Sequence, residues 1–159
     1  MLHQSARLTG AIASSIVMME TITTRFGDIT VDTGKAVLFP RGLLGMPDKS
    51  RFVLANFPTP KMQQFTLLQS LDEHTLSFIT LPLEIKNAIL AEADIKAACR
   101  DLQIEEANLA LLLIVSVHRG VDQVKLSVNA RAPLLIDAAR KVGAQHVFQQ
   151  DHYKVQHML

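Results

Sequence analysis

The chain has 159 residues, of which 48% are apolar and 19% are charged, and its formal net charge at pH 7 is +1. This length suits one domain that buries a sizeable core without a disulfide or a metal ion, and the near-zero charge gives no field that would attract nucleic acid or an anionic membrane surface. The longest apolar run, Leu109–Val115, is far shorter than the ~20 residues that cross a bilayer. The single cysteine, Cys99, excludes an internal disulfide and fits a reducing compartment.

The first nineteen residues differ in composition from the rest of the chain. Residues 1–19 contain one basic and no acidic side chain before the small apolar stretch 11–19. A secretory signal, a transit peptide or a membrane-lying helix would give such a pattern, but one arginine and two interrupting serines are a poor match. We expect an N-terminal extension that is disordered or precedes a translation start at Met18 or Met19, and a domain over residues 20–159.

Short segments rich in β-branched residues follow from residue 20. Residues 21–26 and 29–31 flank a Gly-Asp turn and predict a hairpin. Residues 35–39 predict another strand, because the proline that follows them has no N–H for a ladder. The segment 41–48 carries two glycines and a proline around three apolar side chains and predicts a structured loop packed on the core. Residues 51–57 predict the next strand.

A second hairpin is expected from residues 65–70 and 76–81, which flank a polar turn. The turn contains the neighbouring acids Asp72 and Glu73. Adjacent carboxylates in a turn are usually solvated, and acid–base catalysis needs them to converge in a cleft. We therefore expect Asp72 and Glu73 to be solvated and to have no catalytic role.

One helix is expected to interrupt the strands. Apolar side chains recur at helical spacing at Ile95, Ala98, Cys99 and Leu102. The spacing predicts a helix over residues 94–102, with Asp94 capping its first turn. Cys99 then lies on the buried face, where no histidine or basic residue lowers the pKa of its thiol, so we interpret it as a core residue and not as a nucleophile.

The remaining segments predict four more strands. Residues 109–117 are continuously apolar, as in a central strand, and residues 123–128 pair with them through a Gly-Val-Asp turn. Residues 133–137 and 145–148 are expected to be the last two strands. Eight or more short strands with one helix predict a mainly β fold, a small single-domain β-barrel-like fold of antiparallel strands with one or two short helices.

Known catalytic and metal-binding motifs are missing from the sequence: it has no Gly-rich phosphate loop, no Gly-x-Ser-x-Gly elbow and no His-Glu-x-x-His or Cys-x-x-Cys pair. His146, His152 and His157 fall within fourteen residues of the C-terminus, and three histidines can hold a metal ion. Their spacing puts them on no common helix or strand face, so surface histidines are favoured over a metal-dependent enzyme. We expect no catalytic residue, no cofactor and no metal, and the residues alone lead only to a binding module.

Five blocks of sequence follow one another along residues 20–159. They are Ile22–Ile29 (ITTRFGDI), Phe39–Gly45 (FPRGLLG), Arg51–Leu54 (RFVL), Leu68–Leu71 (LQSL) with Leu76–Phe78 (LSF), and Val128–Ile136 (VNARAPLLI) with Gly143–Val147 (GAQHV) and Tyr153. Together the blocks resemble the flagellar assembly factor FliW family. The chain departs from the commoner family pattern at Met46, Ala130 and Asp137, where an aromatic residue, Leu and Asn are frequent.

The resemblance implies a small β-barrel-like fold and no enzymatic activity. We expect a cytoplasmic location, since the single cysteine fits a reducing compartment. The resemblance also implies two competing partners: newly made flagellin, and CsrA, the dimeric RNA-binding protein that represses flagellin translation. Secretion of flagellin would free the protein to bind CsrA and relieve the repression, which requires only two mutually exclusive binding equilibria. We expect a monomer that contacts neither nucleic acid nor a membrane. The alternative is a single-stranded RNA-binding β-barrel that acts directly on the message, which would need a basic groove with stacking aromatics.

Polar residues beside apolar strands in these blocks are the candidate partner-binding residues. Gln69, Ser70 and Asn129 could contact a partner or satisfy buried backbone groups, and both interpretations stay open. Structural roles are expected for the other motif residues, with aromatic rings filling the barrel, glycines allowing a tight loop and prolines marking strand ends: Phe39, Pro40, Gly42, Gly45, Phe52 and Pro133.

Overall fold

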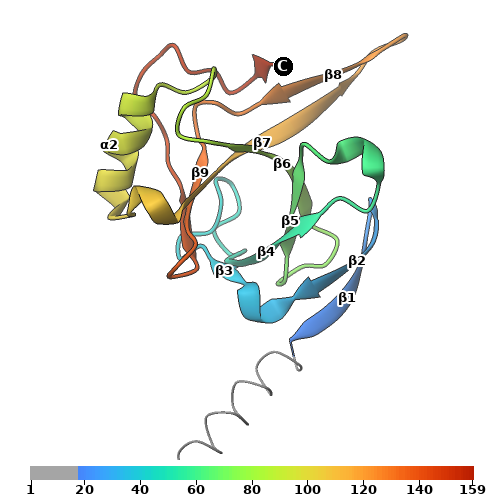
Figure 1. The fold of residues 1–159 in the computed structure, drawn as a ribbon. Coiled ribbons are helices and arrows are strands. Elements are labelled where there is room, and N and C mark those ends of the chain that lie inside the picture. Colours follow the sequence, from blue (N-terminus) through green and yellow to red (C-terminus); the bar gives the residue numbers. More distant parts are fainter. Residues whose placement is uncertain (1–17) are drawn as a thin grey trace, which may run out of the picture.

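The computed structural model describes residues 18–159, and this part of the chain is mainly β, as predicted (Figure 1). The strands are β1 (Met19–Thr24), β2 (Gly27–Asp32), β3 (Val37–Leu38), β4 (Arg51–Asn56), β5 (Thr66–Ser70), β6 (Ser77–Leu83), β7 (Leu109–Arg119), β8 (Val124–Val128), β9 (Leu134–Asp137), β10 (Val142–Gln145) and β11 (His157–Met158). The α-helix is α2 (Glu92–Leu102), and single 3-10 turns form η1 (Thr33–Lys35), η2 (Pro60–Met62) and η3 (Glu106–Asn108).

Seven strands close into a barrel, which confirms the predicted fold class. They pair in the order β7-β6-β5-β4-β3-β10-β9, and β9 pairs back onto β7 with Leu135 opposite Leu111. The prediction of antiparallel strands holds for every pair in the ring except β3 and β10, which run parallel with Leu38 beside Val142. A tight turn makes β10 antiparallel to β9, and the remaining edge of β10 then meets β3 in the parallel sense.

Apolar side chains fill the inside of the barrel. The rings of Phe39 and Phe52 are fully buried and meet edge to face with centroids 5.6 Å apart, a favoured geometry for aromatic pairs. Gly143 of β10 makes room for this pair, since an added Cβ would lie 2.8 Å from the Phe39 ring. The buried interior side chains are Val37, Phe39, Leu43, Phe52, Leu68, Leu112, Leu134 and Ile136.

The long apolar run of β7 is explained by burial on both faces of the strand. Leu112 faces the barrel interior, whereas Leu111 and Leu113 belong to a second cluster with Ile95 and Cys99 of α2. Alternate side chains of a strand point to opposite faces. A strand covered on both sides therefore reads as continuously apolar, with no period of two.

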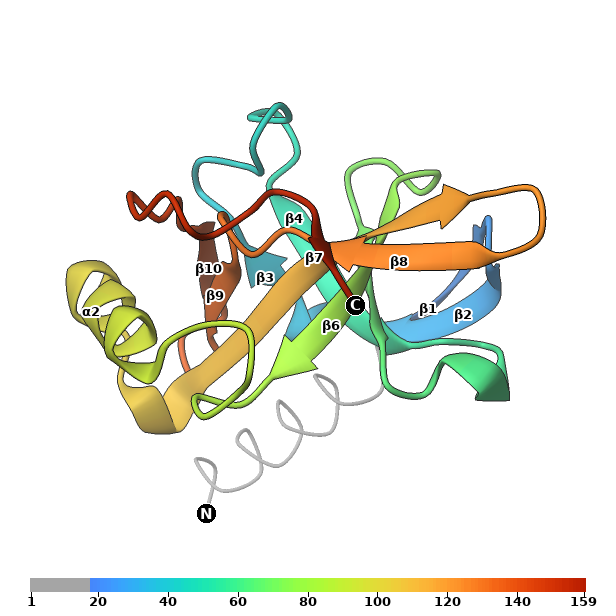
Figure 2. The ribbon, with the colours of Figure 1, turned by 90° about the horizontal axis from the view of Figure 1, so that it is seen from above.

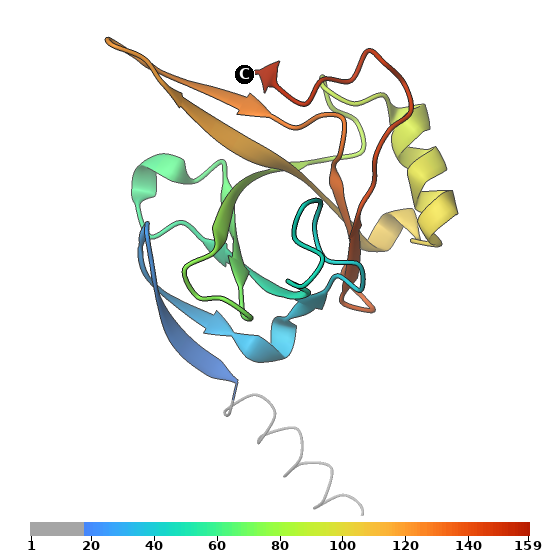
Figure 3. The ribbon, with the colours of Figure 1, turned by 180° about the vertical axis from the view of Figure 1, so that it is seen from behind.

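The outside of the barrel is covered on two opposite sides (Figure 3). Helix α2 and the C-terminal segment cover β7 and β9, with Phe148 and Tyr153 in the same buried cluster. The hairpin β1–β2 packs on β4 and β5, where Ile22 joins Val53 and Leu67 in a third cluster. The two outer clusters therefore lie on opposite sides of the barrel wall.

Several predicted strands have different bounds in the structure. The turn of the first hairpin lies at residues 25–26, so Gly27 and Asp28, which were expected to form that turn, begin β2 instead. The strand expected at 35–39 is reduced to β3 at 37–38, because the side chain of Asp32 accepts a hydrogen bond from the N–H of Gly34 and starts the turn η1. The strand expected at 145–148 is β10 at 142–145, and Phe148 leaves the sheet to pack in the outer core.

The predicted helix cap was wrong. Helix α2 begins two residues earlier than expected, and its N-cap residue, Ala91, makes no side-chain cap bond. The carboxylate of Asp94 instead accepts hydrogen bonds from the hydroxyl of Tyr153 and the side chain of Gln150. The burial of Cys99 on this helix agrees with the prediction.

The N-terminal expectations fall mostly outside the described residues. Of residues 1–19, the structure describes Met18 and Met19, and Met19 begins β1, one residue before the expected start of the domain. Along residues 18–159, no helix has both the length and the apolar character needed to cross a membrane.

Candidate protein-binding surface

The three predicted contact residues lie toward one end of the barrel, here called the loop end. Figure 2 shows the loop between β3 and β4 and the turn between β5 and β6 projecting from this end. Gln69 and Ser70 lie at the end of β5, and Asn129 lies between β8 and β9. The β-ladder brings Ser70 opposite Phe52 and Leu134 opposite Leu112, so segments far apart in sequence meet here.

Gln69 is fully buried and its amide is used within the chain. Its Nε2 donates to the carbonyl oxygens of Ser70 and His74, both at 2.9 Å, and its Oε1 accepts a hydrogen bond of 2.6 Å from Ser77 Oγ. An amide has two donor hydrogens and one acceptor oxygen, and all three are engaged. The side chain therefore presents no surface to a partner, and its effect on one would pass through the 70–76 turn that it holds.

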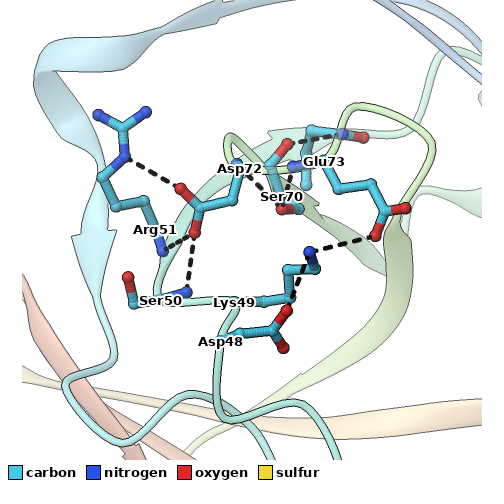
Figure 4. Close-up of polar contacts among 8 residues, drawn as sticks. Asp48, Lys49, Ser50, Arg51, Ser70, Asp72 and Glu73 are labelled. Atoms are coloured by element: carbon cyan, nitrogen blue, oxygen red, sulfur yellow. Dashed lines mark hydrogen bonds and ion pairs between the residues drawn. The ribbon is translucent and has the colours of Figure 1, made fainter.

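Ser70 and Asp72 fix the same turn to the neighbouring loop (Figure 4). The Oγ of Ser70 accepts hydrogen bonds from the N–H groups of Asp72 and Glu73. Asp72 Oδ2 in turn accepts from the N–H groups of Ser50 and Arg51, at 2.8 and 3.0 Å. Contrary to the expectation of a merely solvated carboxylate, Asp72 joins two loops that are about twenty residues apart in the chain.

Charges surround the turn that Asp72 anchors. The two backbone N–H groups and the Arg51 side chain hold the pKa of Asp72 below its usual range, because they favour the ionised carboxylate. Lys49 Nζ lies 3.2 Å from Asp48 Oδ2 and 3.8 Å from Glu73 Oε2. These partly exposed ion pairs contribute little stability, so we interpret them as a charged rim around a rigid turn.

Asn129 shapes the corner between β8 and β9. Its Oδ1 accepts hydrogen bonds from the N–H groups of Arg131 and Ala132, which forms a local side-chain turn. The carbonyl of Ala132 then accepts from Nε2 of Gln145, whose Oε1 accepts from the N–H of Leu44. The amide of Gln145 thereby ties the Asn129 corner to the loop between β3 and β4.

The 42–46 turn is tightly defined. Leu43 and Met46 exchange backbone hydrogen bonds, and Leu43 inserts into the barrel interior. Gly42 has φ +65°, and a Cβ there would lie 2.3 Å from the carbonyl oxygen of Met46. Gly45 has φ +80° in open space. The turn holds Leu44 outward, where 57% of the residue is exposed.

A groove with a volume of ≈ 620 Å³ runs beside Leu44. Its apolar lining comes from three distant segments: Leu43, Leu44, Leu102, Ile104, Val142 and Val147. Val142 and Val147 are 36% and 38% exposed, and the exposed guanidinium groups of Arg41 and Arg140 lie at its rim. An open apolar groove with a polar rim is suited to binding another protein.

One wall of the groove is fixed by a buried carboxylate. Asp137 Oδ1 accepts from the N–H groups of Ala139 and Arg140, and its Oδ2 lies 2.8 Å from Arg140 Nε. The N–H and the guanidinium of Arg140 hold the pKa of Asp137 below its usual range. Side-chain hydrogen bonds therefore hold the turn into β10, just as backbone hydrogen bonds hold the turn that carries Leu44.

The cysteine and the three histidines considered above for catalysis or metal binding are in structural positions. Burial raises the pKa of the Cys99 thiol, which opposes formation of the nucleophilic thiolate. Within residues 18–159, no group of three or more His, Cys, Asp or Glu side chains is arranged to hold a metal ion. His146 and His152 instead lie against the rings of Phe148 and Tyr153, and His157 pairs with β8.

The other motif residues lie in the barrel interior or next to the ends of its strands. Phe39 and Phe52 lie in the barrel interior, Pro40 is exposed just after β3, and the buried Pro133 directly precedes β9. Gln145 and Leu44 were missed as site residues although both lie in the resembling blocks. The loop was expected to pack its apolar side chains on the core; Leu43 does so, but Leu44 is exposed. Nothing in the sequence marks this exposure or the partners of Gln145.

The comparisons with known proteins agree with this architecture. A family model described as FliW protein matches residues 20–159 of the chain. The chain belongs to the FliW family. The flagellar assembly factor FliW of Geotalea uraniireducens (strain Rf4) is 31% identical over 147 residues, which cover 87% of this chain and 83% of that protein. The FliW of Clostridium botulinum (strain Langeland) is 29% identical over 135 residues, 84% of this chain and 91% of that protein.

A solved FliW structure has the same fold. The crystal structure of the flagellar assembly factor FliW superposes with a TM-score of 0.64 at 27% identity, covering 87% of this chain and 96% of that one. The predicted family is thereby confirmed, and the protein is a FliW-type flagellar assembly factor. Its partners are accordingly sought among proteins of flagellar assembly.

Proposed function

We propose that this FliW protein is a non-enzymatic switch that binds flagellin and CsrA in turn and relieves CsrA repression of flagellin synthesis. The observation that supports the proposal is the family match over residues 20–159, with relatives named as flagellar assembly factors. Newly made flagellin and CsrA meet in the cytoplasm, and we place the protein there. Competition for one protein couples flagellin secretion to flagellin synthesis by mass action.

The loop end is the surface on which we place partner binding. Leu44 offers an exposed apolar side chain on a turn that is already in one conformation, so little entropy is lost when a partner covers it. Gln69, Ser70 and Asn129 contribute by holding the neighbouring turns. Gln69 and Ser70 are fully buried and would act only through the turn that they hold, whereas direct contact of the partly exposed Asn129 with a partner stays a prediction.

Calorimetric titration tests the proposal directly. Purified protein is titrated with CsrA and with flagellin from the same organism, and each complex is then challenged with the other partner. We expect both to bind with dissociation constants below ~10 μM, which corresponds to about 7 kcal/mol, and each to displace the other. If neither partner binds in that range, the proposed function is wrong.

A pair of variants tests the proposed surface separately. Leu44→Asp removes the exposed leucine, whose burial is worth about 1.5–3 kcal/mol, so we expect roughly 10- to 100-fold weaker binding of at least one partner. Val121→Asp is the matched control, because Val121 is fully exposed at the tip of the β7–β8 hairpin. Equal affinity for both variants would place the binding surface elsewhere.

RNA binding is the contrasting outcome. A labelled flagellin leader RNA is titrated at 50 and 200 mM salt, where a protein that holds RNA phosphates loses affinity steeply. We expect no binding by the purified protein alone. Tight, salt-dependent binding without CsrA would favour direct action on the message.

A further inference from the structure

Among residues 18–159, no other strand pairs with the outer edge of β1. Figures 1 and 3 both show β1 as the outer strand of the β1–β2 hairpin, and the hairpin forms a two-stranded sheet of its own. The contacts that tie β1 to the barrel come from side chains: Ile22 packs with Leu67, and Glu20 lies 3.7 Å from His74. No other described strand therefore covers the backbone on the outer side of β1.

The register identifies which backbone groups face outward. Met18 accepts a hydrogen bond from the N–H of Thr33, so even-numbered residues of this strand face β2. Because the direction alternates along an antiparallel strand, the N–H and C=O groups of Met19, Thr21 and Thr23 point away from β2. Within residues 18–159, no backbone hydrogen bond to another segment satisfies them.

The edge lacks the usual protection against strand pairing. Natural edge strands carry lysines, prolines or bulges that prevent another strand from adding. The sequence METITT of β1 has neither lysine nor proline, and its pairing with β2 proceeds without a bulge. Thr21 and Thr23 are exposed and β-branched, which suits a strand in a sheet.

We infer that two copies of this chain associate through antiparallel pairing of their β1 edges, which joins the two hairpins into a four-stranded sheet. With a twofold axis at Ile22, Thr21 of each copy exchanges two backbone hydrogen bonds with Thr23 of the other. The only charged side chain of the strand, Glu20, then lies opposite Thr24 and not opposite its own copy. The edge is thus complementary to itself in hydrogen bonding and places no like charges opposite each other, as a twofold interface requires.

The size of the contact sets its strength. A six-residue strand is about 20 Å long, and two such edges bury much less than the ~1,600 Å² of a standard interface. The association is therefore weak and appears only at high concentration. This departs from the monomer expected in the sequence analysis.

Sedimentation equilibrium of the full chain from ~10 μM to ~1 mM tests the inference. We expect the average mass to rise toward that of a dimer in the wild type. Thr23→Pro removes an outward N–H without removing a bond to β2, and edge strands tolerate proline, so this variant is expected to remain monomeric. Thr23→Val keeps the N–H and is the control that should still associate. Thermal unfolding confirms that each variant is folded.

A second variant guards against a folding defect. Thr21→Lys/Thr23→Lys keeps every backbone N–H and places like charges across the pairing, so it should also remain monomeric. A wild type that is monomeric at ~1 mM, or a dimer that persists in both edge variants, overturns the inference. Neither flagellin nor CsrA is present, so failure here is distinct from failure of the proposed function.

Discussion

Replacing Gln69 with methionine isolates the role of its buried amide. Methionine has a similar size and shape, so the substitution leaves little cavity. It removes the two donors that Gln69 gives to the carbonyls of Ser70 and His74, and the acceptor that it gives to the hydroxyl of Ser77. The change therefore tests whether the amide is what holds the 70–76 turn.

The expected loss of stability follows from the groups left without partners. Ser70 and Ser77 are buried at 0% and 3% exposure, whereas His74 lies in an exposed turn where water replaces the lost bond. A buried polar group without a partner costs about 1–3 kcal/mol. Two such groups predict that Gln69→Met lowers the free energy of unfolding by about 2–6 kcal/mol.

Urea unfolding followed by circular dichroism measures this loss, with the double-mutant cycle of Gln69→Met and Ser77→Ala. Since the two side chains bond each other, we expect the double variant to lose less than the sum of the single losses, by about 1–2 kcal/mol. The control Gln64→Met alters an exposed glutamine and should change stability by less than ~0.5 kcal/mol. A loss below ~1 kcal/mol for Gln69→Met would refute the structural role assigned to the amide.

Three further predictions concern the loop end and the C-terminal segment. Gly42→Ala should lower the free energy of unfolding in urea by more than ~2 kcal/mol, because its Cβ would lie 2.3 Å from a backbone oxygen. Gly45→Ala meets no atom within 4 Å and should lower it by about 1 kcal/mol because of the positive φ. Equal losses would contradict the steric explanation. Folding lowers the pKa of Asp72, so its carboxylate stabilises the fold above the ordinary pKa of 3.8, and this contribution is lost as the pH falls through the lower pKa of the folded state. In urea titrations at a series of pH values, Asp72→Asn should be less stable than wild type at pH 7, and the difference should shrink below pH 4. A difference that does not change with pH would rule out a charge effect. Tyr153→Phe removes the hydroxyl that binds Asp94 and should lower the free energy of unfolding by about 1–3 kcal/mol. It should also speed hydrogen exchange in the C-terminal segment. Unchanged exchange would mean that ring packing alone holds this segment in place.

The strands were predictable where their pattern is local. The β1–β2 hairpin follows from its β-branched residues, although its turn lies at residues 25–26 and not at the expected Gly27-Asp28, and β7 follows from a long apolar run. The position of the helix was also readable, because its buried residues recur at helical spacing. Residues that follow one another in the chain carry these signals, so no knowledge of the fold was needed.

Strand ends and side-chain partners were not predictable in the same way. The last barrel strand was placed three residues too late, because the turn before it depends on the contacts of Asp137 with Arg140. Asp94 looked like a helix cap, but Tyr153, 59 residues away in the chain, takes its carboxylate. Each error arises where a distant group outcompetes a local one.

The sequence by itself determined the mainly β fold class and the FliW family, because strand propensity, turn residues and motif order are properties of the linear chain. The tertiary structure alone decided the candidate surface. The groove combines the 40–44 loop, the end of α2 and β10. Gln145 bonds to the loop between β3 and β4, and Asp72 bonds to the N–H groups that precede and begin β4. The outer edge of β1 is likewise visible only in the fold. Hydrogen bonds and apolar contacts act over a few ångströms, so a surface built from distant segments exists only once barrel closure has brought them together.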